Sequence, residues 1–235
     1  MDLKETLQQI VFDAGADAFG VAELETAAAA IHKAYGDTFD GYTRAVSFAV
    51  HLPRRVVDEV LDHPSHTYLA YYDIANSLLN RIGLIVNNRL EREGFLSFPI
   101  PASQRTGENK EGGIFSHRMA AQMAGLGWIG KNCSLISPQN GPRLRLGTVL
   151  TDAPLEPDSP IENRCGDCTQ CRDICPAGAI LGKAFDCNDA LSQRFDFKKC
   201  DAYLSETRQT FGKRICGRCI AVCPYGRKKH AKEGQ

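Results

Sequence analysis

The chain has 235 residues, of which 43% are hydrophobic and ten are cysteines. A chain of this length can bury an apolar core without metal or disulfide staples, so we expect the cysteines to serve chemistry. Twenty-eight basic residues balance twenty-eight acidic ones, which excludes the overall positive field typical of nucleic-acid-binding proteins.

The first residues, MDLKETLQQIVFDAG, are charged and amphipathic. They lack the basic stretch and apolar run of a secretory leader. No apolar stretch reaches the roughly 18 residues of a membrane span. We therefore expect a cytoplasmic protein without membrane contact. In a reducing compartment, clustered thiols are typical of metal ligands rather than of disulfides.

The first part of the chain reads as mixed α/β. Its apolar spacing predicts a helix, a short apolar run, a buried strand and a long helix, in the order Leu3 to Ala14, Ala18 to Val21, Arg44 to Leu52 and Tyr68 to Glu93. An extended LSFPIPA and a polar SQRTGENKEGG loop follow. A second helix is predicted from Phe115 to Ala124, and the alternation in RLRLGTVLTD predicts a strand.

The composition changes at APLEPDSPIENRCGDC, where three prolines interrupt regular structure and the cysteine density rises. We place a domain boundary there. The expected domains are residues 1–157, residues 158–226 and a basic tail, 227–235. The tail is interpreted as a solvated terminus rather than as an RNA-binding patch.

A dense cysteine run, CGDCTQCRDICP, carries the spacing CxxCxxCxxxCP. Short spacings let three thiolates converge on one face of a turn, while the fourth points toward a second cluster. A zinc ribbon needs only two CxxC pairs and leaves the third close cysteine and the proline unexplained. The run therefore predicts ligands of 4Fe-4S clusters at Cys165, Cys168, Cys171 and Cys175.

A second run, CGRCIAVCPYG, repeats the end of this pattern with Cys216, Cys219 and Cys223. Its fourth ligand lies upstream, and spacing alone leaves Cys200 and Cys187 as alternatives. In two-cluster modules the last cysteine of each run binds the other cluster. One cluster is thus expected on Cys165, Cys168, Cys171 and Cys223. The other is expected on Cys216, Cys219, Cys175 and one upstream cysteine.

Between the two regions, residues 117–152 contain the glycine-rich GLGWIG and the only tryptophan. Three glycines indicate a sharp turn or a close approach of the backbone to another group. No strand leads into this segment, so it is not a dinucleotide-binding fingerprint.

The chain resembles the epoxyqueuosine reductases and, more distantly, the reductive dehalogenases. The resemblance is carried by AGLGWIGKN, LTDAPLEPD, CGDCTQCRDICPAGAI, KKCDAYL and CGRCIAVCP, with weaker matches in AGADAFGVAE and RAVSFAVHL. It implies an α+β fold, in which a cobalamin-binding α/β domain of nitroreductase-like ancestry precedes a two-cluster ferredoxin-like module.

The resemblance also implies site residues. Cys200, in KKCDAYL, becomes the fourth ligand, so Cys187 and Cys133 are surplus thiols. The GLGWIGKN segment implies corrinoid contacts at Gly125, Gly127, Trp128, Ile129, Gly130, Lys131 and Asn132. A tight turn that only packs the two domains together is the alternative for this segment.

The family pattern is broken where an acidic proton donor is expected. Glu111 falls at that position in a glycine-rich loop, and His117 lies nearby at a predicted helix start. We name both as candidate catalytic residues, because each can hold a proton near a reacting centre. A solvated loop carboxylate and a helix-capping histidine are the alternatives.

Three hypotheses about function follow. The first is an anaerobic, corrinoid-dependent iron-sulfur reductase with two 4Fe-4S clusters and cobalamin. It would receive electrons from a donor such as a ferredoxin or flavodoxin and act on a small substrate. The second is an electron carrier for a corrinoid protein, and the third is a corrinoid-binding or processing protein. The sequence stops where family members continue into a tRNA-gripping region, so tRNA is not the expected substrate.

Overall fold

The structure is a computed structural model that describes residues 2–104 and 113–227. The chain forms two compact units, each assembled from three separate segments. The first unit comprises residues 1–52, 72–129 and 144–162, and the second comprises residues 53–71, 130–143 and 163–235. Within the described ranges, no helix is both long and apolar enough to cross a membrane.

The first unit contains most of the regular secondary structure. Its strands are β1 (Ala18–Glu23), β2 (Arg44–His51), β3 (Ser97–Ile100), β4 (Trp128–Ile129) and β6 (Leu144–Thr151). Its helices are α1 (Leu3–Asp13), α2 (Ala28–Tyr35) and α5 (His117–Met123), with 3-10 turns η1 (Glu25–Ala27) and η2 (Gly36–Phe39). Helix α4 (His66–Arg92) runs through both units, and residues 72–92 count with the first.

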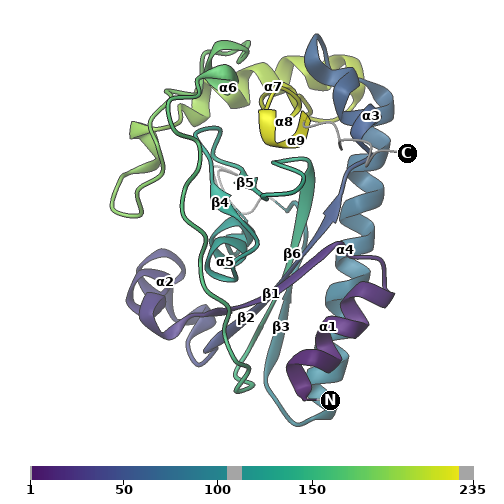
Figure 1. Cartoon of the computed structure of the whole chain (residues 1–235), viewed down its shortest axis with the longest axis vertical. Helices are drawn as coiled ribbons and strands as arrows, with labels where there is room; N and C mark the ends of the chain where they lie inside the picture. Colours follow the sequence, from purple (N-terminus) through teal and green to yellow (C-terminus); the bar gives the residue numbers. More distant parts are fainter. Residues whose placement is uncertain (1, 105–112, 228–235) are drawn as a thin grey trace, which may run out of the picture. The chain divides into compact units, whose positions relative to one another are not determined.

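Four strands form an antiparallel sheet in the order β1-β2-β6-β3. Phe48 pairs with Gly147, and Ser47 pairs with Thr148. Since side chains alternate between faces, Phe48 and Thr148 point to opposite sides of the sheet. Helices α1 and α4 lie on the Phe48 face, where Gly83 of α4 approaches that ring, and α5 covers the other face (Figure 1).

An aromatic cluster fills the space beside α5. The ring centroids of Phe39, Phe98, Phe115 and Tyr35 lie 5.3 to 5.7 Å apart in successive pairs. Tilted and edge-on rings at this separation attract one another beyond their burial. The cluster fixes η2 and the start of α5 against the sheet.

The predicted elements of this unit are confirmed to within a few residues. The helix expected from Leu3 to Ala14 is α1, the strand expected from Arg44 to Leu52 is β2, and the long helix is α4. Asp2 caps α1 in a capping box with Glu5, which explains the sharp start of that helix. The mixed α+β character of the fold is confirmed.

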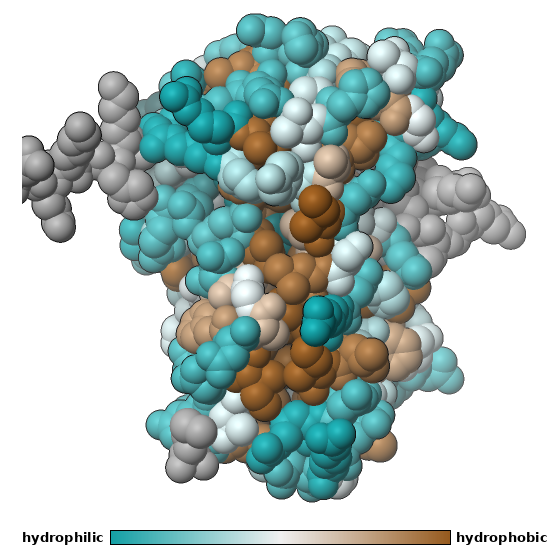
Figure 2. All heavy atoms as spheres, turned by 90° about the vertical axis from the view of Figure 1, so that its right-hand side faces the viewer, coloured by the Kyte–Doolittle hydropathy of each residue, from teal (hydrophilic) through white to brown (hydrophobic). Residues whose placement is uncertain are grey.

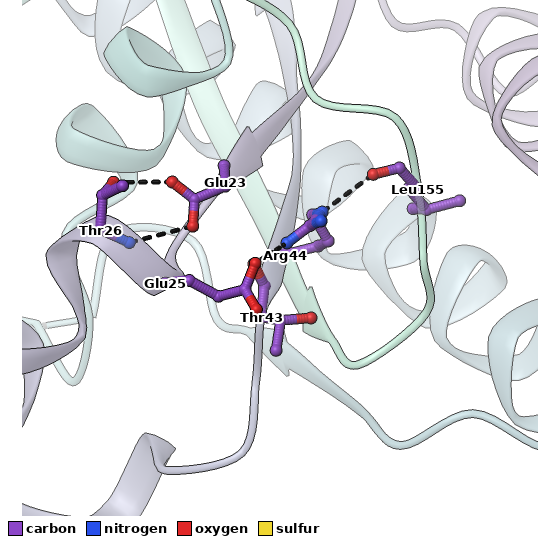
Figure 3. A network of polar contacts seen from close by, with 6 residues as sticks. All are labelled: Glu23, Glu25, Thr26, Thr43, Arg44 and Leu155. Carbon is purple, nitrogen blue, oxygen red and sulfur yellow. Dashed lines mark hydrogen bonds and ion pairs between the residues drawn. The ribbon is translucent and has the colours of Figure 1, made fainter.

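The segment after β6 is tied to the edge of the sheet, so the first unit ends later than predicted. Arg44 donates to the Leu155 carbonyl (2.9 Å) and pairs with Glu25 (2.9 Å), as Figure 3 shows. Asp158 accepts hydrogen bonds from the Val21 backbone N–H (2.8 Å) and from Lys4 Nζ (2.9 Å). These contacts hold residues 152–158 in the first unit, and the unit extends to residue 162 rather than 157.

The outer faces of α1 and α4 expose apolar side chains. Ile74 and Leu84 are 58% and 55% exposed, and Phe12 and Ile85 are also exposed. Figure 2 shows apolar residues gathered on the side of the molecule that carries these helices. Helix α4 is therefore apolar on more than the face that packs on the sheet.

Apart from helix α7 (Phe197–Phe211), the described elements of the second unit are short. They are α3 (Arg54–Asp58), η3 (Glu59–Leu61), β5 (Leu135–Ile136), α6 (Gln170–Asp173), η4 (Leu191–Gln193), α8 (Arg218–Ala221) and α9 (Pro224–Arg227). Helix α7 was not predicted, although Asp196 caps its start and Gly212 ends it in the left-handed region. The expected contiguous domain, residues 158–226, also omits residues 53–71 and 130–143, which pack in this unit.

Candidate iron-sulfur centre

The eight cysteines proposed as cluster ligands all lie in the second unit. Cys171 is part of α6, Cys200 is part of α7, and Cys219 is part of α8. None of the chain's ten cysteines, all of which are described, forms a disulfide. Short helices and turns thus present separate thiols rather than a covalent staple.

Four of these thiols line one cavity. They are Cys165, Cys168 and Cys171 from the first run and Cys223 from the second. Lys131, Asn132, Ile136, Pro224 and Tyr225 complete the lining. The structure thereby brings together the four cysteines that the spacing assigned to one cluster.

Electrostatics in this cavity disfavour bare thiolates. Burial, together with the charges of the neighbouring Cys165, Cys168 and Cys223, raises the pKa of Cys171 to about 11. Burial also raises the pKa of Cys223 to about 11. Four thiolates this close repel one another unless positive charge lies between them. A cluster of iron ions supplies such charge, so the donor set fits a 4Fe-4S group.

A second group of thiols surrounds Cys219. Burial raises the pKa of this thiol well above its ordinary value, and Cys216, Cys171, Cys175 and Cys200 raise it further through their charge. The backbone N–H of Ala179 donates to Cys175 Sγ (3.4 Å). Hydrogen bonds of this kind to cluster sulfurs tune the reduction potential.

The two surplus cysteines lie apart from these groups. Cys187 is exposed. Cys133 is buried, and the Arg194 guanidinium lies 3.7 Å from its Sγ. Of the two upstream candidates, Cys200 is the one that the structure brings to the second group of thiols.

In the described part of the chain, no three histidine, cysteine, aspartate or glutamate side chains converge closely enough to hold a single metal ion.

Residues 130–143 hold the cysteine loops. Lys131 Nζ donates to the carbonyls of Gly166 (2.6 Å) and Cys168 (3.2 Å). Asn132 Nδ2 donates to the Cys219 carbonyl (3.2 Å). Both residues were expected at a corrinoid. Lys131 instead contacts carbonyls of the first cysteine run, and Asn132 contacts a carbonyl of the second.

Arg143 is a further residue that holds a cysteine run, and no prediction from the sequence included it. Its side chain is 3% exposed, and it donates to the carbonyls of Arg54 (3.0 Å) and Ala221 (2.7 Å). It also pairs with Asp58 (2.8 Å). This guanidinium joins all three segments of the second unit. No local pattern marks it, because its partners lie far away in sequence.

The glycine-rich segment divides between the two units, and its other members are buried. Trp128 is 1% exposed, and Gly127 and Ile129 are buried as well. Gly125 has φ +71°, and a Cβ there would lie 2.6 Å from the Ser159 carbonyl oxygen. A Cβ at Gly130 would lie 2.7 Å from the Ile136 side chain. Close packing within the chain therefore accounts for both glycines.

His117 is the first residue of α5 and is hydrogen-bonded at both ring nitrogens. Its Nδ1 lies 2.8 Å from Thr148 Oγ1, and its Nε2 donates to the Pro101 carbonyl at 3.3 Å. Burial lowers the pKa of His117 to about 4. The imidazole is therefore neutral at pH 7. The other candidate, Glu111, lies outside the described residues.

Comparisons with known proteins agree with this geometry. Residues 164–226 match the family of 4Fe-4S double cluster binding domains. An epoxyqueuosine reductase of Bacillus anthracis is 38% identical over 152 residues, which cover 60% of this chain and 37% of the relative. One of Aliivibrio fischeri is 30% identical over 72% of this chain and 45% of the relative. The chain thus spans less than half the length of these curated relatives.

Solved structures extend the likeness to the fold of nearly the whole chain. An epoxyqueuosine reductase with a modified tRNA stem loop has a TM-score of 0.63 and 23% identity, covering 97% of this chain and 66% of its own. A catabolic reductive dehalogenase in complex with 3-bromo-4-hydroxybenzoic acid has a TM-score of 0.76 and 21% identity, covering 97% and 32%. A reductive dehalogenase described with a mechanism for B12-dependent dehalogenation has a TM-score of 0.75 and 20% identity, covering 97% and 32%.

Proposed function

The chain is a relative of the epoxyqueuosine reductases that carries a 4Fe-4S double cluster binding domain, and from this premise we propose that it is a corrinoid-dependent reductase of a small substrate. The observation that carries the proposal is the crossed set of thiols. Three cysteines of one run and one of the other line a single cavity, and the remaining proposed ligands gather around Cys219. Two clusters so held accept and pass on electrons one at a time.

In this proposal the ligands of one cluster are Cys165, Cys168, Cys171 and Cys223. Those of the other are Cys175, Cys200, Cys216 and Cys219. Lys131 acts on the first set through carbonyl contacts, because its ammonium group fixes the Cys165–Cys168 turn. Its positive charge lines the same cavity and favours the more negative, reduced state of a group bound there.

Asn132 and Arg143 act on the second run. Asn132 holds the Cys219 carbonyl, and Arg143 holds the Ala221 carbonyl between Cys219 and Cys223. Since Cys219 and Cys223 belong to different proposed ligand sets, fixing this turn positions both sets at once. The chain's own residues thereby keep the thiols preorganised for cluster binding.

The corrinoid part of the proposal is supported by the dehalogenase whose described mechanism is B12-dependent and whose fold this chain shares. A corrinoid would supply a metal centre that the clusters reduce. Lys131 and Asn132 bond to the cysteine loops, and packing accounts for Gly125 and Gly130. The proposed contacts with the corrinoid are therefore Trp128 and the backbone of Gly127 and Ile129.

The substrate is proposed to be a small molecule rather than tRNA. The sequence has no net charge, whereas proteins that grip nucleic acid carry basic surfaces that neutralise phosphates. Conversion of epoxyqueuosine-containing tRNA by this chain at an enzymatic rate would contradict this part of the proposal.

One preparation tests the cofactors. Anaerobically purified protein should contain about eight iron atoms per chain, as two four-iron clusters require. Cobalamin added to it should shift to its base-off spectrum. If the iron content is as expected and the spectrum does not shift, the chain is an electron carrier. About one metal ion per chain, with zinc in place of iron, would overturn the whole proposal.

A further inference from the structure

A half-buried arginine in the first unit has no carboxylate partner in the part of the chain that the structure describes. Arg145 lies on β6, and its guanidinium stacks over the ring of Tyr72 at 4.1 Å. Its Nε donates to Asn76 Oδ1 (3.0 Å), and its Nη2 donates to the Tyr72 hydroxyl (3.1 Å). None of the ion pairs formed among residues 2–104 and 113–227 includes it. The acceptors that orient this charge, Asn76 and Tyr72, are both neutral.

A chain of hydrogen bonds leads from this guanidinium to an exposed hydroxyl. A guanidinium can only donate, so the Tyr72 oxygen accepts from Arg145 and its own hydrogen is directed to Ser103 Oγ, with which it forms a short hydrogen bond. The Ser103 hydroxyl hydrogen is then left for a further acceptor. Hydrogen bonds in such a chain polarise one another, so the positive charge makes Ser103 a stronger donor.

The backbone at Ser103 is strained. Its φ is +62°, in the left-handed region that non-glycine residues rarely adopt. Two neighbouring contacts hold it there: the Ala102 N–H donates to Asn80 Oδ1 (2.8 Å), and His117 Nε2 donates to the Pro101 carbonyl (3.3 Å). Strain that the surroundings maintain in this way is common at ligand sites.

The charges of two arginines reach the neighbouring His117. After burial and the Pro101 contact, the charges of Arg145 and Arg118 are the next influences on His117, and both lower its pKa. Burial raises the pKa of Tyr35, and the charge of Arg118 lowers it. Among the described residues, no carboxylate is a cause of either shift. The charge of Arg145 would attract an anion placed here.

We propose that Arg145, Tyr72 and Ser103 form a binding site for the carboxylate group of a small organic ligand. One carboxylate oxygen accepts from Ser103 Oγ, and the other accepts from an N–H of Arg145 that Asn76 and Tyr72 leave available. One cation and one hydroxyl match a single negative charge, whereas a phosphate dianion needs more donors. Carboxylate binding at this site is an inference beyond the proposed function. If the chain is the proposed reductase, the inference rests on that function and identifies its substrate as a small carboxylic acid.

Calorimetric titration of the full, cluster-loaded chain tests the site, with benzoate, its neutral counterpart benzamide, and inorganic phosphate as probes. Benzoate should bind, and benzamide and phosphate should not. Arg145→Met should weaken benzoate binding at least about tenfold, since a charge-assisted pair is lost. Arg81→Met, an exposed arginine on the same helix as Tyr72, is the matched control and should bind as the parent does. Tyr72→Phe keeps the ring but removes the hydroxyl that links Arg145 to Ser103, so it should weaken benzoate binding severalfold. This variant replaces Arg145→Met as the test if Arg145→Met does not fold.

Two variants at Ser103 separate a ligand role from a structural one. Ser103→Gly removes the hydroxyl and suits the positive φ, so it should weaken benzoate binding while raising the thermal midpoint. Ser103→Ala should weaken binding without that rise. The proposal is overturned if the parent does not bind benzoate, if Arg145→Met binds it equally, or if benzamide or phosphate binds as well. Iron content and the cobalamin spectrum are read separately, so failure of the reductase proposal gives a different result.

Discussion

The two units of this chain are stabilised in different ways. The first is a sheet between helices, with fully buried side chains such as Leu7, Phe48 and Val149. The second has one long helix, α7, and in the described part of the chain its other own helices have three to five residues. Lysine and arginine bonds to carbonyls connect its segments around the thiols. The difference teaches that apolar burial suffices for the first unit, whereas the second depends on polar links and on what its cysteines bind.

Removing iron should have the largest effect and should act on one unit only. Without a cluster, the buried thiols lose the group that compensates their mutual repulsion, and metal-binding energy is folding energy in such sites. We expect backbone amides of residues 163–227 to lose their protection after chelation, while those of β2 and β6 keep theirs. Hydrogen exchange followed by mass spectrometry measures this. Equal loss of protection in both units would refute the comparison.

A single cysteine change should remove half of the iron. In the proposed ligand set, Cys200→Ser removes one ligand of the cluster around Cys219, so the iron content should fall from about eight to about four per chain. Cys187→Ser is the matched control, because this thiol is exposed and should leave both clusters intact. The reverse pattern would show that the upstream ligand is Cys187.

Acid should weaken the first unit through His117. Burial lowers its folded-state pKa from 6.5 to about 4, so between these values the unfolded chain takes up a proton that the folded chain does not. This contribution to stability is therefore fully present above about pH 6.5 and is lost as the pH falls toward 4, up to about 3 kcal/mol. Denaturant unfolding of the first unit between pH 4 and 7 measures it. His117→Gln should flatten the profile, and an unchanged slope would exclude this residue as the cause.

Truncating Arg143 should destabilise the second unit by about 2 kcal/mol. Arg143→Met leaves the carbonyls of Arg54 and Ala221 without their donor, and unsatisfied buried acceptors cost about this much. Arg55→Met, an exposed arginine on the same helix as Arg54, is the control. Iron release into a chelator should be faster in Arg143→Met alone. Equal rates in both variants would mean that this link does not hold the unit.

The smallest effect is a gain confined to the first unit. A Cβ at Gly83, inside α4, would meet Pro99, Phe48 and Val149 only at 3.8 to 3.9 Å, which is ordinary contact. Gly83→Ala should therefore stabilise the first unit by about 1 kcal/mol, because alanine loses less entropy in a helix. Thermal melting measures the gain, and the rate of iron release should not change. A slower release would show that the units stabilise each other.

Sequence alone was sufficient wherever the decisive contacts are local. The spacing of Cys165, Cys168 and Cys171 lies within one turn and a short helix, so its pattern can be read along the chain. The same holds for α1, β2 and α4, because helical and strand periodicities repeat over neighbouring residues. The crossed pairing of the two cysteine runs is a prediction from the general pattern of such modules, and four of its thiols line one cavity.

Only the tertiary structure decided which distant segments join the cysteine loops. Arg143 contacts Arg54 and Ala221, which lie 89 and 78 residues away, and no periodicity records such contacts. The same reason explains why Lys131, read from the sequence as a corrinoid contact, bonds to the carbonyls of Gly166 and Cys168. Every residue has a backbone carbonyl, so the type of the accepting residue gives no sequence signal for such a hydrogen bond. Its identity can be found only once the fold is known.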